Sequence, residues 1–157
     1  MSLTGMDVFD RTIQTTHIWL NELMQELQWT DRHKAYRALR VVLHLLRDHL
    51  PAEENAHLSA QLPVLIRGIY FEGWRPAATP IADRSRWSFL HQVNEAFNND
   101  PAADAEGIAT AVFQVLTRQT GGLHGVAGNI RNALPGQIRE LWPEEELAVL
   151  PEHQETA

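Results

Sequence analysis

Apolar residues recur every three or four positions through the first third of the chain, which is the spacing of an amphipathic α-helix. The first run predicts a helix over residues 6–27, whose inward face carries Phe9, Ile13, Thr16, Leu20, Leu23 and Leu27. Thr30 is expected to act as the N-cap of a second helix, which reaches about residue 49. Two shorter helices, 51–61 and 63–71, are predicted to begin at Pro51 and Pro63, because proline is tolerated in the first turn of a helix.

The second half of the chain follows a segment, residues 73–80, whose Pro, Gly and Ala content predicts a linker. Helical spacing then resumes and predicts a fifth helix, marked by Trp87, Leu90, Val93 and Phe97. Asp100 and Pro101 are expected to supply the cap and the first residue of a sixth helix. Glycines between 121 and 128 predict a mobile connection and a weak seventh helix, because each helical glycine costs about 1 kcal/mol relative to alanine.

The two halves of the chain share a pattern when the sequence is shifted by 72 residues. Segment 61–67 then falls on 133–139 with matching Leu, Pro, Ile and Arg, and Tyr70 falls on Trp142. We interpret this match as the duplication of a four-helix unit. The predicted fold is therefore all-α, with two related four-helix units packed as a compact helical bundle. The predicted organisation is a first unit over 1–72, a linker over 73–84, a second unit over 85–142 and an acidic, disordered tail over 143–157.

Composition and charge narrow the class of protein. Cysteine is absent, which excludes disulfides and thiol chemistry and suits a reducing compartment. Five glutamates after Pro143 account for most of the formal charge of -7, so the preceding body is nearly neutral. We therefore do not expect nucleic acid as a partner. The first residues lack a signal-peptide pattern, and no apolar run reaches about 18 residues. We expect a cytoplasmic protein with no membrane partner.

The strongest candidate site is a cationic stripe on the predicted second helix. Its members are spaced by four, three, four and three residues, which confines them to an arc of about 80° on the helix; they are His33, Arg37, Arg40, His44 and Arg47. The rest of this helix is mostly apolar, so we expect it to be central. Arg37, Arg40, His44 and Arg47 are matched in the second half by neutral residues, namely Thr110, Phe113, Thr117 and Thr120. A site built on the stripe would therefore belong to the first half alone.

Two interpretations of the stripe are open. In the first, the stripe binds an anion, either a small phosphorylated molecule or an acidic protein segment. In the second, its arginines form structural ion pairs with acidic side chains, the candidates being Glu22, Glu26, Asp48 and Glu72.

The other candidate functional residues in the sequence give weaker indications of a binding or metal site than the cationic stripe does. Tyr70, Phe71 and Trp74 form an aromatic cluster at the end of the first unit, which would be a recognition surface if exposed or a seal between the units if packed. Glu54 and His57 have a spacing that di-iron bundles use, but the second half lacks the matching pair, so we predict no metal site and no cofactor. His-Glu-x-x-His, Gly-x-Ser-x-Gly and glycine-rich phosphate-loop motifs do not occur, so no motif in the sequence supports an enzymatic reaction.

Several of these segments, taken together, resemble a known family. They are Leu-Arg-x-x-Leu-x-x-Leu-Arg-Asp-x-Leu-Pro at 39–51, His-Leu-Ser-Ala-Gln-Leu-Pro at 57–63, Gly-Ile-Tyr-Phe-Glu-Gly-Trp-Arg-Pro at 68–76, Ala-Leu-Pro at 133–135 and Leu-Trp-Pro at 141–143. Over residues 9–143 the chain is similar to the bacterial domain of unknown function 2267 family. The resemblance implies a helical, cytoplasmic bacterial protein and brings no established activity, cofactor or catalytic residue. One departure is Val126 after Gly125, where the family tends to carry a glutamate that would favour the helix start.

From these observations we expect a non-enzymatic interaction module that self-associates, with a homodimer as one possible assembly. One alternative is a binding protein for a small anionic ligand at the cationic stripe. Another is an enzyme whose acid–base groups would come from His44, His57 and nearby carboxylates.

Overall fold

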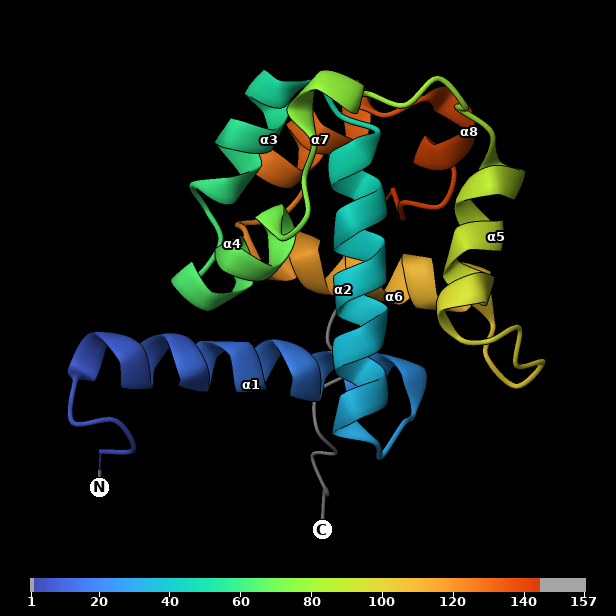
Figure 1. The fold of residues 1–157 in the computed structure, drawn as a ribbon. Coiled ribbons are helices and arrows are strands. Elements are labelled where there is room, and N and C mark those ends of the chain that lie inside the picture. Colours follow the sequence, from blue (N-terminus) through green and yellow to red (C-terminus); the bar gives the residue numbers. More distant parts are fainter. Residues whose placement is uncertain (1, 145–157) are drawn as a thin grey trace, which may run out of the picture.

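The computed structural model describes residues 2–144, so the predicted acidic tail lies outside the described residues from position 145 onward. Within this part the chain forms eight α-helices and one short 3-10 helix, without strands (Figure 1). The helices are α1 (Asp7–Leu27), α2 (Arg32–Asp48), α3 (Ala52–Ser59), α4 (Val64–Phe71), α5 (Arg86–Ala96), α6 (Ala105–Gln119), α7 (Val126–Ala133) and α8 (Gly136–Arg139). The 3-10 helix, η1 (Pro76–Ala78), lies in the predicted linker. The predicted all-α class is confirmed.

The first two helices run in different directions, with α1 passing across the lower end of α2 in the view of Figure 1. The C-terminal half of α1 contacts α2 and α6 and buries Trp19, Leu20 and Leu23. Its N-terminal half extends outward past α4, and there Met6, Val8 and Phe9 keep about half of their surface exposed. Part of the apolar face predicted for this helix is therefore left uncovered.

The start of α2 differs by one residue from the prediction. Asp31, rather than Thr30, is the N-cap, and its carboxylate accepts hydrogen bonds from the backbone N–H groups of His33 and Lys34 at 2.9 and 3.3 Å. The capping carboxylate reaches two N–H groups that have no partner inside the helix, which stabilises the start of α2.

The predicted start of the sixth helix is wrong. Asp100 accepts a hydrogen bond from the backbone N–H of Ala102 at 2.9 Å, and the N–H of Ala103 bonds to the Asp100 carbonyl at the same distance. These bonds close a turn, which competes with helix formation at this point. The helix begins only at Ala105, after Asp104 as the N-cap.

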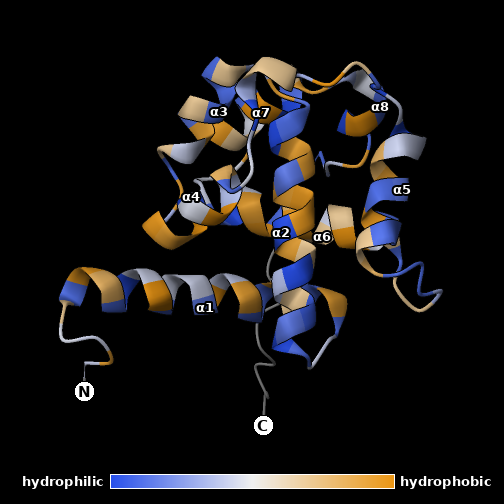
Figure 2. Ribbon diagram, in the orientation of Figure 1, coloured by the Kyte–Doolittle hydropathy of each residue, from blue (hydrophilic) through white to orange (hydrophobic). Residues whose placement is uncertain are grey.

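The core surrounds α2 and α6, the two helices with the most buried side chains, and apolar residues from both halves of the chain join it. α1 packs against α2 and α6, α5 packs against the same two helices, and α3 contacts α7. Phe113 of α6 stacks on Trp142 with ring centroids 4.4 Å apart and planes 7° from parallel. The apolar face of α2 is thus covered on several sides, while a polar face remains visible along it (Figure 2).

Two arginines make the same contacts 72 residues apart. Arg67 donates to the carbonyls of Ser59 and Leu62, and Arg139 donates to the carbonyls of Arg131 and Leu134. Both side chains thereby fasten a short helix to the end of the helix before it. The match agrees with the spacing found in the sequence, and the duplication of the unit stays a prediction.

Arg118 of α6 provides an ionic contact between the halves. Its Nη1 lies 2.7 Å from a carboxylate oxygen of Glu26, and its Nε lies 3.9 Å from Glu22, both on α1. These two glutamates were predicted partners for the cationic stripe, but they pair with Arg118 instead. In the described part of the chain, no helix has both the length and the apolar composition needed to cross a membrane.

Candidate binding groove between α2 and α5

The cationic stripe of α2 faces an open groove that α5 borders on the other side. The groove has a volume of about 840 Å³, and all five stripe residues line it. The remaining lining residues are Tyr36, Val41, Leu45 and Asp48 of α2 and Gln92, Glu95 and Ala96 of α5. The stripe was predicted from sequence, whereas the α5 wall was not.

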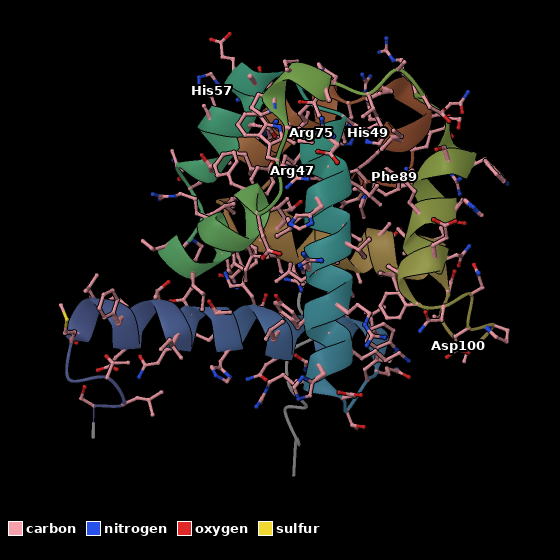
Figure 3. The ribbon with its side chains drawn as sticks, in the orientation of Figure 1. Arg47, His49, His57, Arg75, Phe89 and Asp100 are labelled. Carbon is pink, nitrogen blue, oxygen red and sulfur yellow. The ribbon has the colours of Figure 1, made fainter. Side chains whose placement is uncertain are left out.

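Arg47 is the most deeply placed member of the stripe, with only 5% of its side chain exposed. Its Nη1 donates to the carbonyl oxygens of Tyr70 and Glu72 at 3.0 and 2.7 Å, and its Nε donates to the Asp48 carboxylate at 2.9 Å. It lies on the side of α2 that faces α4 and the linker (Figure 3). These contacts supply partners for carbonyls at the C-terminal end of α4, where a helix lacks internal donors.

His44 and Arg40 reach the same end of α4. His44 Nε2 lies 2.6 Å from the Ile69 carbonyl oxygen, so the ring nitrogen donates its proton there. Burial lowers the pKa of His44, and the positive charges of Arg47 and Arg40 lower it further. The hydrogen bond to the Ile69 carbonyl acts in the opposite direction and raises the pKa. Arg40 forms an ion pair with the Glu72 carboxylate at 2.5 Å, and this pair lowers the pKa of Glu72.

Three members of the stripe are therefore engaged with the protein itself. Of the four acidic partners predicted from sequence, Asp48 and Glu72 do pair with Arg47 and Arg40. We call the contacts of Arg40, His44 and Arg47 with the C-terminal end of α4 the clamp. Its backbone carbonyls could not be identified from residue types, because every residue carries one. The clamp orders the end of α4 and the entry to the linker.

The other two members, His33 and Arg37, lie nearer the N-terminus of α2 and are exposed. The Arg37 guanidinium carbon lies 5.7 Å from the centroid of the Phe97 ring, which is an attractive cation–π geometry. The ring of Phe97 in turn packs near the ring of Trp29, with the two ring centroids 5.9 Å apart. Within residues 2–144, Arg37 has no carboxylate within ion-pair distance, so its N–H donors are oriented by the ring and remain available.

The exposed face of α5 that carries Glu95 continues beyond the groove and combines charge with aromatic surface. Glu95 pairs with His91 on the same helix at 3.1 Å, and His91 stacks on Trp87 with ring centroids 4.8 Å apart. Trp87 is 72% exposed. The sequence predicted Trp87 as one of the apolar positions that mark this helix, but it did not predict this exposed face. The spacing of four residues between Trp87, His91 and Glu95 was the only local signal for it.

The predicted aromatic surface is only partly available to a partner. Tyr70 is fully buried, and its hydroxyl donates to Asn55 Oδ1, so it does not reach the surface. Phe71 and Trp74 are half-buried and contact each other at 5.1 Å. The cluster packs where α4 meets the linker, and the indole N–H of Trp74 donates to Thr79 Oγ1 at 3.2 Å.

The other residue pair noted in the sequence lies far from the groove, on α3. His57 Nδ1 is 3.9 Å from a carboxylate oxygen of Glu54. In the part of the chain that the structure describes, no group of three or more metal-binding side chains comes together.

The fold and the groove together define a class: an all-helical protein with an open, charge-lined groove beside its central helix. The model of one family, described as an uncharacterized conserved protein (DUF2267), matches residues 16–141. The chain belongs to this family, which confirms the resemblance carried by its sequence motifs. No curated protein matches the chain.

Proposed function

We propose that the protein is a non-enzymatic interaction module, and that the groove between α2 and α5 is the surface where a partner binds. The observation that carries the proposal is Arg37, an exposed guanidinium that is held against Phe97 and lacks an acidic partner in the described structure. A preoriented arginine at the edge of an open groove can bind an acidic group with little loss of conformational entropy.

The residue types around the groove support this proposal. Exposed Tyr36 and Arg37 stand on one wall, and exposed Trp87 lies on α5 two helical turns from Glu95. Tryptophan, tyrosine and arginine are the residues most often found at energetic hot spots of protein interfaces. The apolar surfaces of the Tyr36 and Trp87 rings would be removed from water when a partner covers them, which favours binding.

The protonation chemistry of the groove favours binding over acid–base catalysis. His44 already donates its Nε2 proton to the Ile69 carbonyl, and its lowered pKa favours the neutral ring. Arg40 and Arg47 are fixed by contacts within the protein. The groups that could move protons in the clamp are therefore engaged in holding α4.

Site-specific photocrosslinking tests this proposal in the cells that produce the protein. A benzoylphenylalanine residue at position 36 should yield a discrete adduct with a partner, because this side chain borders the groove. The same probe at exposed Glu53 on α3 is the matched control and should not yield that adduct. The proposal is contradicted if position 36 yields no adduct or the same products as position 53.

Self-association is a second candidate, and a different surface favours it. Met6, directly before α1, and Val8 and Phe9 of α1 are exposed, and so are Val64 and Leu65 of α4. The Leu65 N–H donates to Thr12 Oγ1 at 3.0 Å, which places the two groups beside each other. Exposed apolar side chains on two adjacent helices are typical of protein contact surfaces. Light scattering should show a dimer that Phe9→Glu dissociates and Trp87→Glu does not, and a monomer at all concentrations would contradict this candidate.

A further inference from the structure

The formal charges that line the groove fall into two groups. Arg47 is neutralised by Asp48, and Arg40 is neutralised by Glu72. This leaves Arg37 on the α2 wall and Glu95 on the α5 wall as the two charges without a partner of fixed opposite charge in residues 2–144. They do not form an ion pair with each other. The open groove therefore presents one positive and one negative group on its facing walls.

Each of the two groups is available to a ligand. Arg37 offers the planar donor fork that matches a carboxylate, and Phe97 restricts its orientation. The Glu95 side chain is 58% exposed, and its ion-pair partner is a histidine on the same helix. A ligand could thus place an acid on one wall and a base on the other.

The lining of the groove is also partly apolar. Val41 of α2 and Ala96 of α5 line it and are half-buried, whereas Leu45 is buried. An apolar side chain of a ligand would be covered by these residues. The volume of about 840 Å³ also exceeds what a single small anion would fill.

We infer that the groove binds a mixed-charge segment of a protein, with a carboxylate on Arg37, an apolar residue over Val41 and Ala96, and a basic side chain on Glu95. This inference rests on the proposed function and names the chemistry of the partner. A dianionic phosphate or an acid-only segment is disfavoured, because Glu95 would repel it from the facing wall.

Capped peptides of increasing length, each with a glutamate, an intervening leucine and a lysine, provide the test. Binding is followed by chemical-shift changes in the ¹⁵N-labelled full chain. The mixed-charge peptide should bind about tenfold more tightly than its acid-only and base-only versions or than inorganic phosphate. Arg37→Gln should lower the affinity by a similar factor, whereas Arg84→Gln, an exposed arginine of the linker, should not change it.

A charge reversal makes the test independent of absolute affinity. Glu95→Lys places a second cation in the groove, so this variant should prefer the acid-only peptide to the mixed-charge peptide. The inference is overturned if the acid-only peptide or phosphate binds the unaltered protein as tightly as the mixed-charge peptide, or if Arg37→Gln has no effect. If position 36 still crosslinks a partner in that case, the proposed function stands and only the mixed-charge ligand is wrong.

Discussion

The buried guanidinium of Arg47 donates to the main-chain carbonyl of Tyr70 at 3.0 Å and so joins the central helix to the end of α4. The C-terminal end of a helix carries unpaired carbonyls and a partial negative charge. Arg47 therefore meets an anion-like group that belongs to the protein itself. The chemistry expected of the cationic stripe is present, and for this residue it is used inside the fold.

Replacement of Arg47 by methionine should lower the free energy of unfolding by about 3 kcal/mol, because the carbonyls of Tyr70 and Glu72 and the Asp48 carboxylate would lose their donor. Urea unfolding followed by circular dichroism measures the change. Arg11→Met is the matched control, since Arg11 is 77% exposed in its pair with Asp7 and should contribute less than about 0.5 kcal/mol. Equal losses in the two variants would show that the clamp does not stabilise the fold.

The clamp should also make stability depend on pH through His44. Its pKa in the folded protein is below the ordinary value of about 6.5, mainly because of burial, so the unfolded chain binds more protons in the window just below pH 6.5. The stabilisation is therefore complete above that pH and is lost as the pH falls through the folded-state pKa.

Urea midpoints measured from pH 7.5 to 5.5 should decrease for the unaltered protein. The decrease should be smaller in His44→Gln, whose amide can still donate to the Ile69 carbonyl. His17→Gln, at an exposed position of α1, is the control and should retain the full decrease. Glu72, whose pKa is also lowered, acts below pH 4.5 and outside this window. Identical pH profiles for all three proteins would remove His44 as the cause.

The helices could be predicted because their signals are local. The apolar spacing located α1 and α2 to within a residue or two. Pro51 and Pro63, which were predicted to begin two helices, lie directly before the first residues of α3 and α4. The start of α6 was misplaced because Asp100 and Pro101 resemble a helix start, whereas the Asp100 side chain closes a turn. Local patterns cannot decide between these two uses of aspartate.

Of the two walls of the candidate groove, only the one formed by α2 could be predicted from the sequence. Helix geometry alone brings the stripe residues to one face of α2, so their common location follows from spacing. Which of them are free depends on α4 and α5, which approach α2 only in the folded chain. The pairing of Glu72 with Arg40 was among the predicted options, but nothing in the sequence placed Glu95 across the groove from Arg37.

A buried polar contact beside the clamp yields another prediction. The Tyr70 hydroxyl donates to Asn55 Oδ1, and Asn55 Nδ2 donates to the Arg47 carbonyl at 2.9 Å. Tyr70→Phe would leave the Asn55 oxygen without a donor in a buried site and should cost about 1–2 kcal/mol of stability. Tyr36→Phe, at the exposed edge of the groove, should change the urea midpoint very little. If Tyr70→Phe left the free energy of unfolding unchanged, a water molecule would have to replace the hydroxyl as the donor to Asn55.

Two glycines should respond in opposite directions to the same substitution. A β-carbon at Gly128 in α7 would lie 1.9 Å from the Leu123 carbonyl oxygen, whereas one at Gly68 in α4 would meet nothing within 4 Å. Gly128→Ala should therefore destabilise the protein by about 2–3 kcal/mol through overpacking of the backbone, despite the better helix propensity of alanine. Gly68→Ala should stabilise it by about 0.5–1 kcal/mol, because it only reduces the entropy of the unfolded chain. Thermal unfolding of both variants measures the contrast. If Gly128→Ala were stabilising, α7 would have to lie farther from residue 123 than this fold places it, and the glycine would reflect weak helix propensity instead of close packing.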